Sequence, residues 1–339
     1  MRRTKIIATL GPSTDDPATL AKLFEAGVDV VRVNFSHGDA DTREKRVRTV
    51  RAVAEQCGKY IAVLGDLQGP KIRIQRFRNG PVQLVEGQSF VLDTAMDPQA
   101  GTVEGVGVAY QQLPNDVTSG DNLLLDDGFI TLTVERVSGT RIHCTVLQGG
   151  PLGDNKGINR QGGGLSAPAL SDKDRQDLVQ AAALGVDWLA VSFVRCADDL
   201  HEARALLHKA GSSAHLVAKI ERAEALANLE SVIDAADAVM VARGDLGVEM
   251  GYAGLTGLQK QILKMTRHRH KIAITATQML ESMIHNKVPT RAEVSDIANA
   301  VLDGTDAVML SAETAVGEHP VRAVMSMAEV CVGAESYYL

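Results

Sequence analysis

The sequence predicts an α/β protein in which eight strand–helix units close into a (β/α)₈ TIM barrel, with a small all-β domain inserted after the third strand. Three observations predict this class: a phrase that recurs at the start of strands, a count of eight strand candidates, and one long interruption. With 339 residues, 45% of them hydrophobic, the chain is long enough for one barrel and one smaller domain.

The recurring phrase runs from the end of an amphipathic stretch through a small residue and an aspartate into an apolar run. It occurs as AGVDVVRVNF, LGVDWLAVSF, AADAVMVARG and DGTDAVMLSA. A glycine after a helix supplies a left-handed cap, and a β-branched run is typical of a strand buried on both faces. The phrase therefore indicates the step from helix to strand in a repeating βα unit.

Eight strand candidates result when the apolar runs without this lead-in are added. They are KIIATL, VVRVNF, YIAVLGDL, WLAVSF, HLVAKIE, AVMVARG, IAITATQ and AVMLSAE. Helical patterns separate them, and three of the helices have start signals. These signals are Pro17 after Asp15 and Asp16, Ser171 with Asp174, and Thr290 with Glu293. Eight such units favour a closed barrel over an open doubly wound sheet.

About a hundred residues interrupt the alternation of strands and helices, between the third strand candidate and the helix expected near Ser171. Short alternating runs such as SFVLDT, NLLLDDGFITLTVERV and RIHCTVL, separated by glycine turns, are typical of a small β barrel or sandwich. We predict a barrel over residues 1–70 and 168–339 and an inserted β-barrel domain over residues 71–167. An insert at this point leaves from the C-terminal rim, where barrel active sites lie, so it is placed to act as a lid.

Polar side chains gather after the strand candidates, at the end of the barrel where the strands finish. Lys219 and Glu221 share one face at the end of LVAKIER, and Asp245 follows the next strand in VMVARGDLGVE. Two carboxylates suit a hard divalent cation, and an ammonium beside them can neutralise developing negative charge. The pattern predicts metal-assisted chemistry on an anion, with a structural ion-pair network as the alternative.

Composition argues against several other classes. The formal net charge of -7 does not favour a general nucleic-acid binder. The chain has no GxxxxGK[ST] loop and no GxGxxG after the first strand, so a nucleotide site of either type is not supported. The four cysteines are scattered without a CxxC pair, and no apolar stretch approaches a signal peptide or a membrane span of about 18 residues. We expect a cytoplasmic protein with no membrane partner.

The chain resembles pyruvate kinase over nearly its whole length. The resemblance rests on KIIATLGPS, VRVNFSHG, GDLQGPKIR, KGINRQGGGLSAPALSDKD, VAKIER, MVARGDLGVE, TATQMLESM and PTRAEVSDIANAVLDGTDAVMLSAETAVGEHP, in the family's order. That family transfers the phosphoryl group of phosphoenolpyruvate to ADP, giving pyruvate and ATP in glycolysis, on a (β/α)₈ barrel with a lid after the third strand. The resemblance therefore implies a kinase with these substrates.

Residue by residue, the resemblance implies a metal and phosphoryl site. Glu221 and Asp245 would hold Mg²⁺ or Mn²⁺. Lys219 would act as a catalytic residue that stabilises the charge of the transferring phosphoryl group and of the enolate, and Arg32 would contact the same phosphoryl group. Such roles fit phosphoryl transfer, which depends mainly on positioning and on neutralising oxygen charge.

The resemblance also implies how the rest of both substrates is held. The backbone amides of Gly244 and Asp245, with the hydroxyl of Thr277, would bind the substrate carboxylate. Protonation of the enolate is assigned only to a water relay near Thr277 and Ser311. The residues that match nucleotide-side positions are Arg73, His37, Asn34 and, from the lid, Lys156.

Two departures from the family pattern matter, and the first concerns potassium. In the potassium-requiring branch, a monovalent-cation site is built from groups matching Asn34, Ser36, Asp66 and a threonine, with a glutamate nearby. Here the threonine position is Leu67 and the glutamate position is Lys71. Because a fixed ammonium can replace a bound K⁺, we expect activity without added potassium.

The second departure is at the C-terminal end. Members of the family usually continue into an αβ domain with the allosteric effector site and one subunit interface, whereas this sequence ends at VCVGAESYYL. We expect that domain and its effector control to be absent. A homo-oligomer is compatible with the resemblance, but one family interface would be missing and barrel surface would be exposed.

Two other functions remain open at this point. A metal-dependent lyase or aldolase acting through a pyruvate enolate would share Lys219, Glu221 and Asp245. It would not need Lys156 on a lid or the nucleotide contact of Arg73. A non-catalytic remnant, kept as a binding protein, is the third possibility, because fold alone does not establish function.

Overall fold

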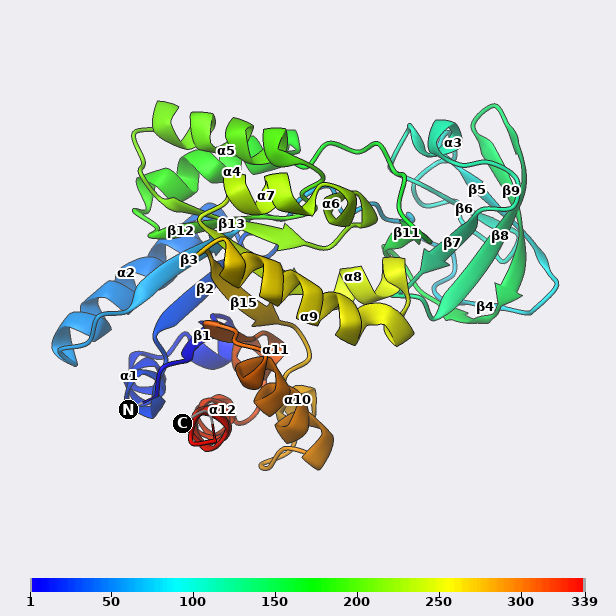
Figure 1. The fold of residues 1–339 in the computed structure, drawn as a ribbon. Coiled ribbons are helices and arrows are strands. Elements are labelled where there is room, and N and C mark those ends of the chain that lie inside the picture. Colours follow the sequence, from blue (N-terminus) through cyan, green and yellow to red (C-terminus); the bar gives the residue numbers. More distant parts are fainter. Residues whose placement is uncertain (1, 338–339) are drawn as a thin grey trace.

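The barrel predicted from the sequence is present in the computed structural model, which describes residues 2–337. Eight parallel strands close in the order β1-β16-β15-β14-β13-β12-β3-β2 (Figure 1). Their bounds are β1 Lys5–Thr9, β2 Val30–Asn34, β3 Ala62–Asp66, β12 Trp188–Val191, β13 His215–Ile220, β14 Ala238–Ala242, β15 Ile272–Ala276 and β16 Ala307–Leu310. All eight strand candidates and the predicted fold class are confirmed.

Helices connect successive strands and cover the outside of the barrel (Figure 1). They are α1 Pro17–Ala26, α2 Ala40–Gln56, α4 Asp172–Ala183, α5 Ala197–Lys209, α6 Ala223–Ala227, α7 Leu229–Ala235, α8 Arg243–Met250, α9 Tyr252–His268, α10 Arg291–Leu302, α11 Ala312–Ala315 and α12 Pro320–Glu335, with 3₁₀ turns η1 Pro12–Thr14 and η2 Glu281–Ile284. The three predicted start signals are confirmed. Asp16, Ser171 and Thr290 are N-caps whose side chains accept backbone N–H groups of the first turn.

The inserted domain lies to one side of the barrel, next to α8 (Figure 1). Its elements are β4 Val82–Leu84, β5 Ser89–Asp93, β6 Gly105–Gly107, α3 Leu113–Asp116, β7 Asn122–Leu125, β8 Ile130–Ser138, β9 Arg141–Gln148, β10 Gly150–Leu152 and β11 Ile158–Arg160. Among the described residues its strands form a six-stranded and a two-stranded sheet, in an insert that we expected to be a small β barrel or sandwich. Bridges from Arg73 to Gly157 and from Ile74 to Val108 connect the two edges of the six-stranded sheet, next to β11 and β6.

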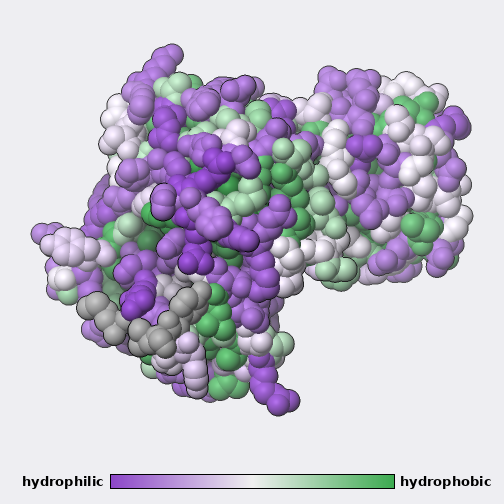
Figure 2. Space-filling view, in the orientation of Figure 1, coloured by the Kyte–Doolittle hydropathy of each residue, from purple (hydrophilic) through white to green (hydrophobic). Residues whose placement is uncertain are grey.

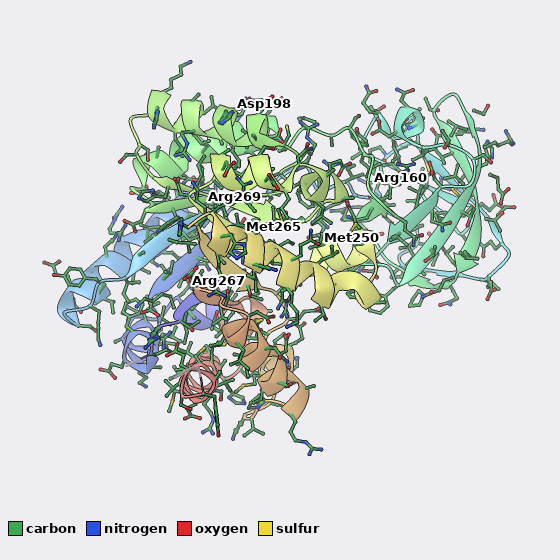
Figure 3. All side chains as sticks on the ribbon, in the orientation of Figure 1. Arg160, Asp198, Met250, Met265, Arg267 and Arg269 are labelled. Carbon is green, nitrogen blue, oxygen red and sulfur yellow. The ribbon has the colours of Figure 1, made fainter. Side chains whose placement is uncertain are left out.

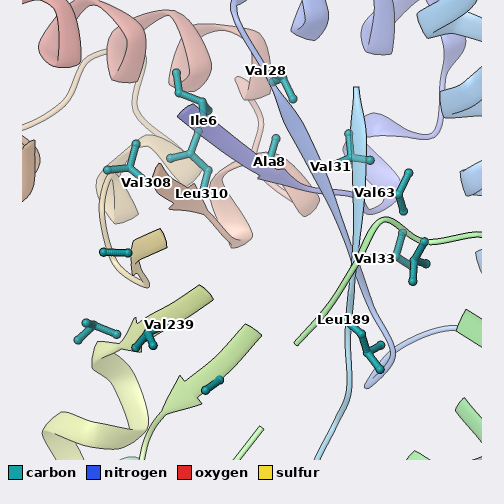
Figure 4. Packing of buried hydrophobic residues seen from close by; sticks show 14 of the residues in the cluster. Ile6, Ala8, Val28, Val31, Val33, Val63, Leu189, Val239, Val308 and Leu310 are labelled. Atoms are coloured by element: carbon teal, nitrogen blue, oxygen red, sulfur yellow. The ribbon is translucent and has the colours of Figure 1, made fainter. Parts of the chain in front are cut away.

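The barrel strands are buried on both faces, as their continuous apolar runs predict. Outward-facing residues such as Ile6, Val31 and Val308 pack against the helices in one large core (Figure 4). Inward-facing residues form a second core inside the barrel, which includes Leu64 and Val217. The polar rim therefore lies above an apolar layer of buried side chains.

The aspartate of the recurring phrase has the same role at each of its four occurrences. Its carboxylate accepts the backbone N–H of a residue on the neighbouring strand, near the N-terminal end of the barrel. The pairs are Asp29 with Ile6 at 2.8 Å, Asp187 with Val63 at 2.6 Å, Asp237 with Leu216 at 2.8 Å and Asp306 with Ala273 at 2.8 Å. The phrase is therefore a strand clamp as well as a boundary signal.

The visible face over the barrel helices is mostly hydrophilic, with smaller hydrophobic areas between them (Figure 2). Within residues 2–337, no helix combines the length and apolar character that crossing a bilayer requires.

Candidate active site

Three cations and three carboxylates meet at the C-terminal rim of the barrel. We call this set the rim cluster: Arg32, Lys71, Lys219, Asp66, Glu221 and Asp245. Lys219 Nζ lies 3.2 Å from Asp66 Oδ1 and 3.0 Å from Glu221 Oε1. With equal numbers of each charge, the cluster can accept a cation and an anion together without a net excess of charge.

Arg32 and Asp66 form the base of the rim cluster. Arg32 Nε donates to Asp66 Oδ2 at 2.6 Å, and Arg32 Nη1 donates to the hydroxyl of Thr9 at 3.1 Å. Asp66 is only 1% exposed. Burial alone would raise the pKa of Asp66, but the charges of Lys219 and Arg32 outweigh it and hold that pKa below its usual value. Asp66 is therefore an anion that fixes both cations.

Lys219 is buried at the end of β13 and has three polar neighbours. Besides Asp66 and Glu221, its Nζ donates to Ser192 Oγ at 2.6 Å, and Ser192 in turn donates to the carbonyl of Leu67 at 2.7 Å. Burial lowers the pKa of Lys219, but the two carboxylates raise it more, to a net increase. The Lys219 side chain therefore stays protonated, so it can act as a fixed positive charge and does not act as a base.

Glu221 belongs to the rim cluster and also accepts a hydrogen bond from a strained backbone position. Its Oε2 accepts the N–H of Phe193 at 2.8 Å, and Phe193 has a left-handed φ of 55° just after β12. Such strain in a non-glycine residue persists only where surrounding contacts impose it, and it often marks a functional site. Burial, and then the charge of Asp245, raise the pKa of Glu221 against the opposing effect of Lys219.

The donor set of Glu221 and Asp245 fits a divalent ion. Asp245 raises the pKa of Glu221, so the two carboxylates repel one another, and a bound cation would relieve that repulsion. Among the described residues no set of three histidine, cysteine, aspartate or glutamate side chains forms a metal site. Mg²⁺ commonly takes one or two protein carboxylates and completes its shell with water and substrate oxygens. Two carboxylates therefore suffice for it.

Lys71 contacts one of these two carboxylates. Its Nζ lies 3.3 Å from Asp245 Oδ1, and both side chains are partly exposed. Its ammonium is thus directed at a proposed metal ligand. Asp66, from the proposed monovalent-cation site, is instead occupied by Arg32 and Lys219.

Gly244 and Thr277 are brought together across the ends of β14 and β15. The N–H of Gly244 donates to Thr277 Oγ1 at 3.0 Å, and Thr277 Oγ1 donates to the carbonyl of Ala276 at 2.7 Å. Thr277 has a left-handed φ of 71°, and Arg243 stabilises this turn by donating to the Thr277 carbonyl at 2.6 Å. The first turn of α8 therefore faces the same rim as Lys219.

The predicted nucleotide-side residues do not form one contact set. Arg73 donates to the carbonyl of Asn155 at 2.8 Å, so it lies beside the segment that carries Lys156. Lys156 itself pairs with Asp126 on the insert at 2.8 Å. His37 is exposed on the barrel. On the barrel too, Asn34 Oδ1 accepts the N–H of Ser36 at 3.0 Å, which is a local turn contact.

The return connection from the lid is hydrogen-bonded to the C-terminal end of α8. Gly162 to Gly164 all have positive φ, and the N–H of Gly162 donates to the carbonyl of Glu249 at 3.0 Å. The carboxylate of Glu249 accepts the N–H of Ala223 at 3.0 Å. Figure 3 labels Arg160 and Met250, which flank this junction on the lid and on α8. Glu249 thus lies where the two domains join.

We expect stability to fall between pH ~4.5 and about 7, where Glu249 is ionised in the unfolded chain but still protonated in the fold. Burial, with the charge of Glu224, raises the pKa of Glu249 to about 7. Because the folded pKa lies above the unfolded one, this group stabilises the fold below pH ~4.5, and the contribution is lost as pH rises through about 7. The loss is on the order of 3 kcal/mol.

The measurement is the melting temperature of wild type and Glu249→Gln across this pH range. Glutamine keeps an acceptor for the Ala223 N–H but cannot ionise. The wild type should lose stability relative to the variant between pH 5 and pH 8, which corresponds to about that free energy. A difference that does not change with pH would contradict the assignment.

Several residues of the site were not predicted from the sequence. Ser192, the Phe193 amide and Glu249 are all defined by contacts between segments far apart in the chain. The one sequence signal was Ser192, near the end of the fourth strand candidate WLAVSF. A polar residue at a strand's C-terminal end is a candidate by the same reasoning that selected Lys219.

The fold and the charged rim cluster together are typical of a (β/α)₈ barrel enzyme with its site at the C-terminal rim. A family model described as "Pyruvate kinase, barrel domain" matches residues 1–324. The chain belongs to the pyruvate kinase family.

Similar proteins agree with this membership. The chain is 54% identical over 338 residues to a pyruvate kinase of Haemophilus influenzae, covering 99% of this chain and 71% of that protein. It is also 54% identical to pyruvate kinase II of Salmonella typhimurium, with 99% and 70% covered. A crystal structure of a pyruvate kinase from Cryptosporidium parvum superposes with a TM-score of 0.95 at 37% identity, covering 99% of this chain and 70% of that one.

Proposed function

We propose that this protein transfers the phosphoryl group of phosphoenolpyruvate to ADP, giving pyruvate and ATP. The observation that carries the proposal is the buried ammonium of Lys219, held by Asp66 and Glu221 beside the second carboxylate of Asp245. Phosphoryl transfer needs little more than positioning and neutralisation of oxygen charge. A balanced set of cations and carboxylates supplies both.

The rim cluster divides the chemistry among its residues. The bond between phosphorus and the enolate oxygen breaks, and a new bond forms between phosphorus and a terminal oxygen of ADP. Arg32 and Lys219 bind the phosphoryl oxygens, and Lys219 also stabilises the enolate that is left. A divalent ion held by Glu221 and Asp245 would supply further positive charge to the same oxygens. A proton delivered to the enolate carbon, through water near Thr277 and Ser311, completes pyruvate.

The substrate carboxylate and the nucleotide occupy the two sides of this centre. We assign the carboxylate to the start of α8, where Gly244, Asp245 and Thr277 offer two backbone amides and a hydroxyl. In the structure the Gly244 N–H donates to Thr277 Oγ1, so substrate would replace or share that hydrogen bond. The proposed nucleotide-side residues are Arg73, His37, Asn34 and Lys156.

A coupled assay of pyruvate formation from phosphoenolpyruvate and ADP with Mg²⁺ tests the proposal. Turnover that depends on both substrates supports it. The lyase or aldolase alternative is separated by Lys156→Ala, which should reduce turnover with ADP only if the lid serves a kinase. Absence of turnover by a folded, monodisperse protein would favour a non-catalytic remnant.

We propose the domain division at residues 1–70 and 168–339 for the barrel and 71–167 for the lid. It is supported by the apolar core of the insert, whose buried members run from Ile72 to Ala167. The glycine run at Gly162 to Gly164 lies just inside the second boundary.

The cytoplasmic location and a homo-oligomer stay predictions. The thiols Cys57, Cys144, Cys196 and Cys331 are all free, which is compatible with a reducing compartment. Sedimentation of the purified protein would measure its assembly.

We predict turnover without added potassium. The Lys71 ammonium already lies in the rim cluster, 3.3 Å from Asp245 Oδ1, and can supply the fixed positive charge that a monovalent cation would bring. The assay compares K⁺ with tetramethylammonium at constant ionic strength, in wild type and in Lys71→Glu. Wild-type rates should be equal in the two salts, and the variant should require K⁺. A large increase in the wild-type rate with K⁺ would contradict the prediction.

We also expect Ser192→Ala to lower kcat by about tenfold or more, since a hydrogen bond to a charged group contributes about 1.5–3 kcal/mol. Ser192 positions Lys219 through the 2.6 Å contact to its Nζ and does not contact substrate in this proposal. The KM for ADP should stay near the wild-type value, because the nucleotide lies on the other side of the centre. A simple loss of folding would change the melting temperature and both constants together, so the split between kcat and KM decides.

A further inference from the structure

A cavity of about 360 Å³ opens inside the barrel at its N-terminal end, opposite the rim cluster. Its wall is formed by inward-facing residues near the starts of the barrel strands. These are Ile7, Val30, Leu64, Val217, Ala238, Ile274 and Ala307, together with Trp188. A space of this size far exceeds the roughly 10–15 Å³ that one water molecule needs. It is therefore large enough for a small organic molecule.

The wall offers water few hydrogen bonds. All of its members except Trp188 are aliphatic, and most belong to the apolar core inside the barrel. Trp188 is partly buried and lies against His215, with ring centroids 4.8 Å apart and planes tilted by 37°. Apolar pockets of a few hundred Å³ with an aromatic wall are the usual form of small-molecule sites. The wall thus favours an apolar body.

The mouth of the cavity carries two cations and one carboxylate. Arg3 and Lys5 are exposed, and no described residue pairs with the Arg3 guanidinium. Within residues 2–337, the ion pair of Lys5 is a loose one with Asp29, at 3.8 Å. The carboxylate in the lining is Asp306, whose Oδ2 is already engaged by the N–H of Ala273. An anionic group at the mouth would therefore find cations with little competing pairing.

We propose that this cavity binds a small amphipathic carboxylate, with its apolar body against Trp188 and its anionic group at Arg3 and Lys5. The site is separate from the rim cluster. Leu64 and Val217 line it, and Asp66 and Lys219 lie two residues further along the same strands. The buried residues of the interior core that do not line the cavity lie between the two ends; they are Ala190, Met240, Ala276 and Met309. The proposal does not depend on the phosphoryl-transfer assignment.

Trp188 makes the site directly observable, because it is the single tryptophan of the chain. The whole protein is titrated with sodium octanoate, and the tryptophan emission is followed. Octanamide, which has the same chain without the charge, is the matched ligand. We expect a saturable change with octanoate at about millimolar concentration or below, and binding of octanamide weaker by about fivefold, or about 1 kcal/mol.

Variants test the two halves of the site. Arg3→Gln and Lys5→Gln should each weaken octanoate binding by about fivefold, whereas the exposed control Lys209→Gln should change it by less than about twofold. Val30→Phe and Ala307→Leu, made separately to fill the cavity, should abolish saturable binding measured by calorimetry. A melting temperature near wild type shows that at least one of them is folded.

Three results would overturn the proposal. They are a fluorescence change that does not saturate, equal binding of octanoate and octanamide, and undiminished binding by a folded cavity-filling variant. Failure of the pyruvate assay has no bearing on these readouts, since binding is measured without either substrate.

Discussion

Glu221→Gln should abolish turnover, with kcat reduced by about a thousandfold or more, because one of two proposed metal-ligating carboxylates is lost. The structure favours glutamine over alanine for this test. Glu221 is 3% exposed and accepts the Phe193 N–H, so alanine would also leave a buried donor unpaired.

Metal affinity supplies a readout besides turnover. Binding of Mn²⁺ alone, followed by calorimetry, should weaken in Glu221→Gln, whereas Glu25→Gln on the exposed side of α1 should leave both affinity and turnover unchanged. Near-normal turnover in folded Glu221→Gln would remove Glu221 from the metal site.

Lys219→Met should have an effect of similar size, with kcat reduced by about a thousandfold or more, because the methyl thioether keeps the volume and loses the charge. The proposal gives Lys219 no part in binding ADP, so the KM for ADP should change little. Lys219→Arg should not restore the rate, since a planar guanidinium does not fit between Asp66, Glu221 and Ser192 as a point charge does.

The stability of Lys219→Met needs its own control. Removing the ammonium leaves Asp66 paired with Arg32 but takes the nearest cation from Glu221. The double variant Lys219→Met with Glu221→Gln should therefore be more stable than Lys219→Met alone. If the single variant retains more than about a tenth of wild-type kcat, the electrostatic role assigned here is wrong.

Much of the fold could be predicted from the sequence because its signals are local. The strand candidates were found from continuous apolar runs, and helix starts such as Ser171 and Thr290 from capping residues within one turn. The grouping of the lid strands could not be predicted in the same way. Which strand β4 pairs with depends on long-range register, and that is not encoded within a single run.

The residues of the candidate site, too, were predictable where the signal is local and unpredictable where it depends on contacts between distant segments. Lys219, Glu221 and Asp245 were selected by their places at strand ends, which a barrel brings to one rim. The partner of Lys71 was not foreseen, since the contact with Asp245 joins the segment after β3 to the first turn of α8, far apart in the chain. Nor could the raised pKa of Glu249 be foreseen, because it arises from burial at a junction between two domains.

The strand clamps formed by the recurring aspartates divide the barrel into four pairs of neighbouring strands. Each clamp joins the two strands of one pair: β1 to β2, β3 to β12, β13 to β14, and β15 to β16. The lid is inserted between the two strands of the second pair, but the clamp of that pair, from Asp187 to Val63, lies at the opposite end of the barrel from the insert. Each doubling of an inserted loop costs only about 0.6 kcal/mol in closure entropy. We therefore expect the lid to be replaceable by a shorter or foreign insert while β3 and β12 stay paired in the closed barrel.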